Sequence, residues 1–168
     1  AAEAYEEALA HSIAVVASNT VAASDAQERY EGLKQLALRM GVEYRFETNV
    51  GAGLPLIDTI QHLVQSGDRI HKIEGMFSGT LNYVFSNFHS GITFKKVIED
   101  ARAAGLTEPD PRTDLSGVDV QRKILILARE AGYTLEMADV EGKGFLLDSQ
   151  MEGSIDAFMD SLPEIEEA

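Results

Sequence analysis

Four acidic side chains gather around one turn-rich stretch of the sequence, TEPDPRTDLSG (107–117). They are Glu108, Asp110, Asp114 and Asp119. Two prolines in the same stretch, Pro109 and Pro111, fix their own backbone angle φ and push the residue before each of them into an extended conformation. A solvated acidic loop does not need that restraint. The pattern therefore favours a loop that holds carboxylates in set directions, as a binding or catalytic site requires.

A lysine follows these acids on a predicted helix that runs from Ser116 to about Ala131. Asp119 and Lys123 are four residues apart, so they share one face of that helix. The run ILILA (124–128) is apolar almost all round, which predicts a helix buried on most sides. A lysine at the edge of a core needs a partner and can change its pKa. From spacing alone, the simpler interpretation is a helix ion pair worth roughly 0.3–0.5 kcal/mol.

Two short stretches with glycines are further candidates. In VGAGLP (50–55), Gly51 and Gly53 permit a positive φ or a close approach of the backbone to a ligand. The spacing is not the G-x-G-x-x-G fingerprint of a dinucleotide site. SGT (78–80) stands where a helix should begin, so it can cap that helix or bind an anion. An ordinary turn and an ordinary cap are the simpler interpretations.

The elements that must position these residues alternate between helix and strand patterns. Apolar periodicity, caps and stop glycines predict helices over about 2–10, 24–40, 56–66, 79–88, 93–105 and 116–131. Thr93 is a predicted cap, and one face of the 24–40 helix carries Tyr30, Leu33, Ala37 and Met40. Apolar β-branched or alternating runs predict strands over 13–18, 42–48 and 69–78. This order predicts an α/β fold in which helices cover a mixed β-sheet.

Composition narrows the class of protein. The chain has 168 residues, a net charge of −14 and no cysteine. The negative charge argues against nucleic acid and anionic membranes as partners. No apolar run is long enough for a membrane span, and the acidic N-terminus does not resemble a signal peptide. A cytoplasmic location fits this composition.

Three segments together resemble the homoserine dehydrogenase family, in particular the enzymes fused behind an aspartate kinase. They are ETNVGAGLP (47–55), FSGTLNYVF (77–85) and GLTEPDPRTDLSGVDVQRKILILARE (105–130). The resemblance implies the reduction of aspartate semialdehyde to homoserine with NAD or NADP as cofactor. That reaction belongs to threonine and methionine biosynthesis.

The resemblance also implies roles for five side chains. Lys123 would protonate the aldehyde oxygen as hydride arrives, and Asp119 would orient Lys123 or relay its proton. Glu108 and Asp114 would hold the polar groups of the substrate, with Glu108 suited to its ammonium. Thr80 would also contact the substrate.

A cation site and part of the cofactor site are implied in the glycine turn. The ligands of a sodium or other monovalent ion would be the Glu47 side chain and the backbone carbonyls of Val50, Ala52 and Leu54. Oxygen ligands of this kind suit a hard cation. Pro55, with Gly53 beside it, would lie near the nicotinamide ring.

The resemblance divides the chain into three parts. Residues 1–23 would be the end of a truncated nucleotide-binding (Rossmann) domain, 24–145 the catalytic and dimerisation domain, and 146–168 an acidic, truncated C-terminal segment. The chain would then be a homodimer that lacks most of its cofactor-binding half, and we expect it to be inactive alone.

One departure leaves a second interpretation open. The family usually has Asn-Lys after its apolar strand, whereas this chain has Asn19 followed by Thr20. The missing charge favours a non-catalytic binding or oligomerisation module that kept the fold. The intact acids of 108–119 and Lys123 favour the enzyme.

Overall fold

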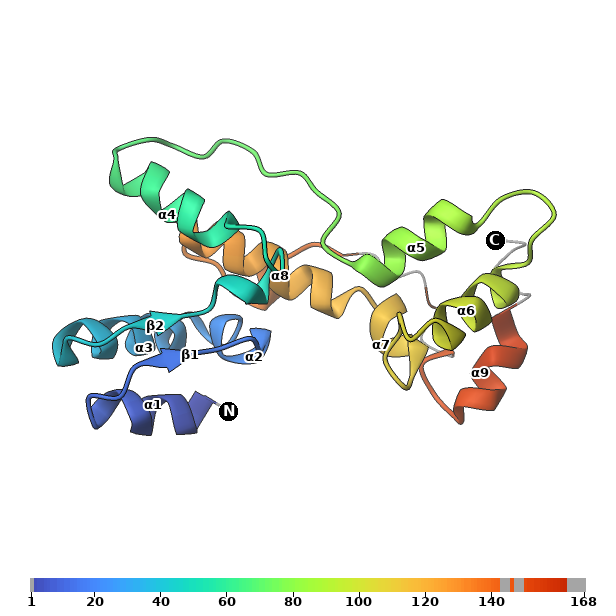
Figure 1. Ribbon diagram of the computed structural model, residues 1–168, viewed down its shortest axis with the longest axis horizontal. Helices are drawn as coiled ribbons and strands as arrows, with labels where there is room; N and C mark the ends of the chain where they lie inside the picture. The colour runs from blue at the N-terminus through green and yellow to red at the C-terminus, as the bar shows by residue number, and fades with distance from the viewer. Residues whose placement is uncertain (1, 143–145, 147–149, 163–168) are drawn as a thin grey trace. The chain divides into compact units, whose positions relative to one another are not determined.

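The computed structural model describes residues 2–142, 146 and 150–162 (Figure 1). The chain forms two compact units. Unit 1 combines residues 1–77 with 121–141, and unit 2 combines 78–120 with 142–168. The boundary at 120/121 falls within one helix, α8 (Val118–Glu130).

Unit 1 begins with alternating helices and short strands. Its first elements are α1 (Ala2–Ala10), β1 (Val15–Val16), α2 (Thr20–Ala23), α3 (Gln27–Met40) and β2 (Tyr44–Arg45). The two strands pair in parallel, with Val15 opposite Tyr44 and Val16 opposite Arg45. The α/β class predicted from the sequence is confirmed, although the sheet is small and the unit is rich in helix.

The start of α3 differs from the prediction. The Asn19 side chain caps α2, a short helix that the sequence patterns did not indicate. Ser24 ends α2, and α3 starts after Ala26, which has no capping side chain. Helix α3 buries the predicted face at Tyr30, Leu33 and Ala37, whereas Met40 at its last position is 37% exposed.

The rest of unit 1 contains two short 3₁₀ helices and two α-helical elements. These elements are the 3₁₀ helix η1 (Glu47–Asn49), α4 (Leu56–Gln65), most of α8 and the 3₁₀ helix η2 (Met137–Asp139). The apolar run of α8 is buried as predicted, because Leu125, Ile126 and Leu127 are at most 1% exposed.

The predicted strand over 69–78 is wrong. Residues 68–78 have no regular secondary structure and run as an extended connection past α4 (Figure 1). Within the described residues no strand pairs with this segment, and a strand requires a hydrogen-bonded neighbour. The side chains that pack against the core are Ile70, Ile73 and Phe77, whose spacing of three and four residues is not the alternation of a half-buried strand.

Unit 2 is helical in its described part. It contains α5 (Gly79–Asn87), α6 (Phe94–Ala103), α7 (Pro111–Leu115) and α9 (Ile155–Ser161). Ser78 caps α5 and Thr93 caps α6, as their positions in the sequence predicted. The core joins α5, α6, α7 and α9 through Val84, Ile98, Leu115 and Phe158.

Helix α7 lies inside the loop that was expected to be irregular. The Asp110 side chain caps it and Pro111 occupies its first position, which suits a residue without an N–H. Of the acidic segment 146–168, only 146 and 150–162 lie within the described residues. No helix in the described part of the chain has the length and apolar character needed to cross a membrane.

A buried carboxylate ties three helices of unit 1 together. The Glu130 side chain, on α8, is 1% exposed. It accepts hydrogen bonds from the Tyr30 hydroxyl and the Lys34 ammonium of α3, the latter at 2.9 and 3.1 Å. The Gln61 amide of α4 donates a further bond at 2.6 Å. Burial beside this carboxylate raises the pKa of the Tyr30 hydroxyl.

We expect Glu130→Ala to lower the free energy of unfolding by about 2–4 kcal/mol, because three buried or half-buried donors lose a charged acceptor. Glu31→Ala is the matched control, since Glu31 is exposed on α3 and bonds only to Gln27. Urea titration followed by circular dichroism gives both values. Equal midpoints for the two variants would contradict this role of Glu130.

Candidate active site

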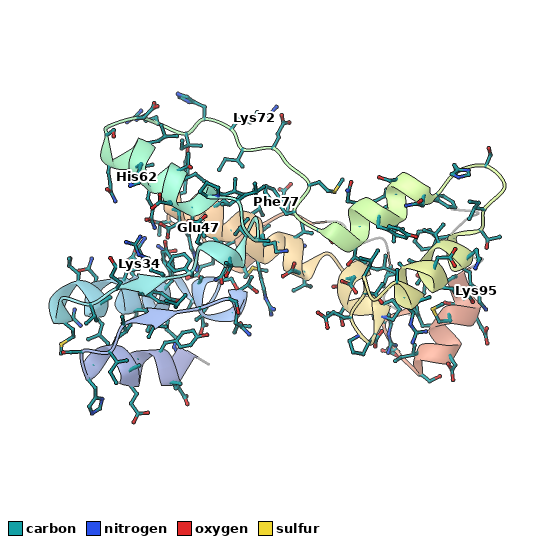
Figure 2. All side chains as sticks on the ribbon, viewed as in Figure 1. Lys34, Glu47, His62, Lys72, Phe77 and Lys95 are labelled. Atoms are coloured by element: carbon teal, nitrogen blue, oxygen red, sulfur yellow. The ribbon has the colours of Figure 1, made fainter. Side chains whose placement is uncertain are left out.

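Lys123 is partly buried on α8, in keeping with the expected position at the edge of a core. Its Nζ donates a hydrogen bond to the backbone carbonyl of Phe77 at 2.8 Å. Phe77, labelled in Figure 2, ends the extended connection of unit 1. The carbonyl fixes the direction of one of the three ammonium donors. Asp119 lies one helical turn earlier in α8 and is also partly buried.

Three predicted substrate residues meet within unit 2. Thr80, in the first turn of α5, is 9% exposed, and its Oγ1 lies 3.1 Å from Oδ1 of Asp114. The other carboxylate oxygen of Asp114, Oδ2, accepts a hydrogen bond from the backbone N–H of Glu108 at 2.8 Å. The Glu108 side chain is exposed to solvent. The fold therefore brings Thr80 into one cluster with Asp114, which lies 34 positions later in the chain.

An arginine that the sequence analysis did not single out holds the same loop. Arg112 forms hydrogen bonds through Nε and Nη2 to the Asp110 carboxylate, and they hold the pKa of that carboxyl below its usual value. Its Nη1 donates to the backbone carbonyls of Met151, Glu152 and Gly153 at 3.0–3.3 Å. The pair Asp110–Arg112 around Pro111 is a local signal that could have been noticed. Its carbonyl partners, about 40 residues away, leave no mark in the sequence.

Glu47 performs a task that its position in the sequence did not reveal. Its two carboxylate oxygens accept hydrogen bonds from the backbone N–H groups of Ile57 and Asp58, each at 2.8 Å. These are the first free donors of α4, whose N-cap residue, Pro55, makes no side-chain cap. A carboxylate at the N-terminus of a helix accepts hydrogen bonds from N–H groups that have no partner within the helix. Its negative charge also interacts favourably with the positive end of the helix dipole.

The turn between Glu47 and α4 has an unusual backbone. Gly51 has φ of 52°, and a Cβ there would lie 2.6 Å from Cδ1 of Leu56, so a side chain at this position would strain the backbone and displace the Leu56 side chain. The next left-handed residue is Ala52, with φ of 50°, and not Gly53, which has no positive φ. Residues with a Cβ seldom adopt this conformation, and strain of this kind clusters at ligand sites.

A cavity of about 940 Å³ lies beside this turn in unit 1. Glu47 and Pro55 line it together with residues of α3, β2 and α4. Within the described residues no group of three or more His, Cys, Asp or Glu side chains could hold a metal ion. A cation here would need backbone carbonyls as ligands, which is the set that the resemblance implies.

Comparison with known proteins identifies the family of this chain. The family model described as homoserine dehydrogenase matches residues 55–166. The chain belongs to the homoserine dehydrogenase family. The matched region includes α5, the 107–117 loop and α8, which carry the candidate residues 80–123.

Relatives of the homoserine dehydrogenase family cover nearly all of the chain. The bifunctional aspartokinase/homoserine dehydrogenase 1 of Zea mays, named as chloroplastic, is 44% identical over 164 residues, which are 97% of this chain and 18% of that protein. The chain thus spans about a fifth of the length of such curated relatives.

Solved homoserine dehydrogenases have the same fold. A putative homoserine dehydrogenase from Archaeoglobus fulgidus gives a TM-score of 0.72 at 28% identity and covers 97% of this chain and 48% of that one. A hyperthermophilic archaeal homoserine dehydrogenase in complex with NADPH gives a TM-score of 0.70 at 29% identity, covering 77% and 40% of the two chains. The resemblance read from the three sequence motifs is confirmed.

We expect Glu47→Ala to lower the free energy of unfolding by about 1–2 kcal/mol, because two N–H groups of α4 lose their acceptor. Urea titration in choline chloride, without sodium, isolates the capping effect from any bound cation. Glu43→Ala is the control, since the Glu43 side chain is exposed and bonds to Arg45, outside α4. Loss of stability only when sodium is added would refute the capping role.

Proposed function

We propose that this chain forms the catalytic and substrate-binding region of a homoserine dehydrogenase. The enzyme would be an oxidoreductase that reduces aspartate semialdehyde to homoserine with NADH or NADPH, in threonine and methionine biosynthesis. The observation that supports this most is the partly buried Lys123, whose ammonium is held by the Phe77 carbonyl at 2.8 Å. A lysine held in this way is a positioned cation rather than a solvated surface charge.

The chemistry assigned to Lys123 follows from charge development. When hydride adds to the aldehyde carbon, the carbonyl electron pair moves to oxygen and creates an oxyanion. A positioned ammonium stabilises that negative charge and then transfers a proton to the oxygen. Asp119, one turn earlier in the helix, would set the direction of the ammonium or relay its proton.

Glu108 is the proposed ligand of the substrate ammonium. Its carboxylate is exposed, and within the described residues its side chain makes no hydrogen bond or ion pair. It is therefore available to a cationic ligand. Thr80 and Asp114 belong to the same cluster and contribute to substrate binding from it.

The glycine turn suits both groups that the resemblance places there. The nicotinamide ring supplies or accepts the hydride, and the exposed apolar surface of Leu54 and Pro55, with no side chain at Gly53, suits a flat ring. We also propose a sodium or similar ion between Glu47 and the carbonyls of Val50, Ala52 and Leu54. Each carboxylate oxygen can accept more than one bond. Glu47 can therefore cap α4 and bind the ion at the same time.

The proposal has further consequences for partners and location. The partner is a small molecule, which fits a net charge of −14 better than nucleic acid or an anionic membrane. We expect the reaction to take place in the cytoplasm. The maize relative is named as chloroplastic.

We expect Lys123→Ala to lower the turnover of homoserine oxidation by roughly two to four orders of magnitude, because the general acid of the reduction serves as the general base of the reverse reaction and this is the usual effect of removing such a group. Lys123→Met should do the same while keeping most of the side-chain packing. Asp119→Asn should lower turnover to a smaller extent. Steady-state kinetics are measured on the complete polypeptide that carries this chain, with the melting temperature as a second readout.

Arg122→Ala, which removes the neighbouring cation of α8, is the control and should keep near-normal turnover. Normal turnover in Lys123→Met would end the catalytic assignment of the lysine. Absence of dehydrogenase activity in the unmodified protein would favour the second candidate function, a binding or oligomerisation module, for which Thr20 in place of a lysine is the supporting observation.

We also propose that the protein is a homodimer. The extended segment 68–78 has backbone groups that no strand within the described residues pairs with, and Met76 in it is 62% exposed. A second copy can cover such an edge by adding a strand. We expect a dimeric mass by light scattering at micromolar concentration. Glu74→Pro, which removes an N–H from the segment, should weaken the dimer, whereas Glu74→Thr should not; a monomeric unmodified protein would refute the proposal.

A further inference from the structure

The cluster of unit 2 assigns a more specific task to two of its members. We propose that Asp114 and Thr80 are positioning residues that hold the backbone of residues 106–108 and thereby aim the Glu108 carboxylate at the substrate ammonium. We call this arrangement the Asp114 clasp. It deepens the proposed function and rests on it, because it takes Glu108 as the group that contacts the substrate.

Asp114 is occupied by the protein itself. Oδ2 accepts the backbone N–H of Glu108 at 2.8 Å, and Oδ1 lies 3.1 Å from the Thr80 hydroxyl. Oδ2 therefore has a backbone donor from this chain, and Oδ1 shares the Thr80 hydroxyl hydrogen with the carbonyl of Leu106. A direct bond to the substrate would have to use the remaining lone pairs of these oxygens, beside the contacts that they already make within the protein.

Thr80 holds the other end of the same segment. Its hydroxyl donates to the backbone carbonyl of Leu106 at 2.5 Å and is also within reach of Asp114. Thr80 is 9% exposed and lies in the first turn of α5, which Ser78 caps. Because a hydroxyl carries one hydrogen, its single proton serves two acceptors that both belong to the protein.

The Asp114 clasp restricts the backbone of Glu108, so that only its side chain can change conformation. The carbonyl of Leu106 is fixed by Thr80, and the N–H of Glu108 is fixed by Asp114. Pro109 restricts Glu108 to extended backbone conformations. Asp114 is itself anchored, because the next residue, Leu115, is fully buried in the core of unit 2. The exposed carboxylate thus projects from a segment held at both ends.

A double-mutant cycle separates a positioning role from direct contact with the substrate. Glu108→Gln should raise KM for L-homoserine by about 10- to 100-fold, the cost of losing a charge-assisted hydrogen bond. Asp114→Ala should also raise KM, with a smaller change in kcat. If Asp114 acts through Glu108, the double variant should resemble Glu108→Gln alone. Effects that multiply would overturn the proposal.

A substrate without the ammonium gives the internal control. For 4-hydroxybutyrate, kcat/KM should change little in Glu108→Gln or in Asp114→Ala, because neither would act on a missing group. Glu99→Ala removes an exposed acid of α6 and controls for net charge. A large loss on 4-hydroxybutyrate in Asp114→Ala alone would show that Asp114 acts on another part of the reaction and would also overturn the proposal.

Amide hydrogen exchange tests the clasp without any activity. The Glu108 N–H should exchange slowly in the unmodified protein and faster in Asp114→Ala and in Thr80→Val, while Thr80→Ser should preserve its protection. Unchanged exchange at Glu108 in Asp114→Ala refutes the clasp. If the unmodified protein does not oxidise homoserine, the proposed function fails, and the exchange data still decide whether the clasp exists.

Discussion

The buried Glu130 carboxylate is the interaction on which unit 1 depends. It joins α3, α4 and α8 through Tyr30, Lys34 and Gln61, and its side chain is 1% exposed. A buried charge is costly unless it is paired and fully hydrogen-bonded, so the three helices keep one arrangement to satisfy it. Because α8 also carries Lys123 two turns earlier, the same carboxylate helps to fix the lysine proposed to act on the substrate.

In each unit, bonds to backbone groups hold the candidate functional side chains. Lys123 is held by the carbonyl of Phe77, Glu47 binds the first N–H groups of α4, and Asp114 binds the N–H of Glu108. A side chain that bonds to a backbone group fixes a segment rather than a single neighbour. This is how short turns and extended connections, which lack ladders of their own, hold charged groups in set directions.

The two units reach order by different means. Unit 1 combines a small parallel sheet with buried charged networks, in which Arg129 also donates to the carbonyls of Ala23, Asp25 and Leu135. Unit 2 relies in its described part on helix caps and an apolar core, with Arg112 tying α7 to residues 151–153.

Local chemistry in the sequence determined most of the helices. The caps Ser78 and Thr93, the buried face of α3 and the apolar run of α8 depend on residues within one or two turns, and all were predicted. The motif of 105–130 also determined the family and the residues proposed to act on the substrate. These features could be predicted because helix hydrogen bonds and caps close over three or four residues.

Tertiary structure alone decided the remaining features. The stretch 69–78 has the composition of a strand but finds no partner in the described part of the chain. The bond from Lys123 to Phe77 spans 46 residues, and that from Lys34 to Glu130 spans 96. Such contacts depend on which distant segments the fold brings together, and neither propensity nor spacing within a segment contains that information.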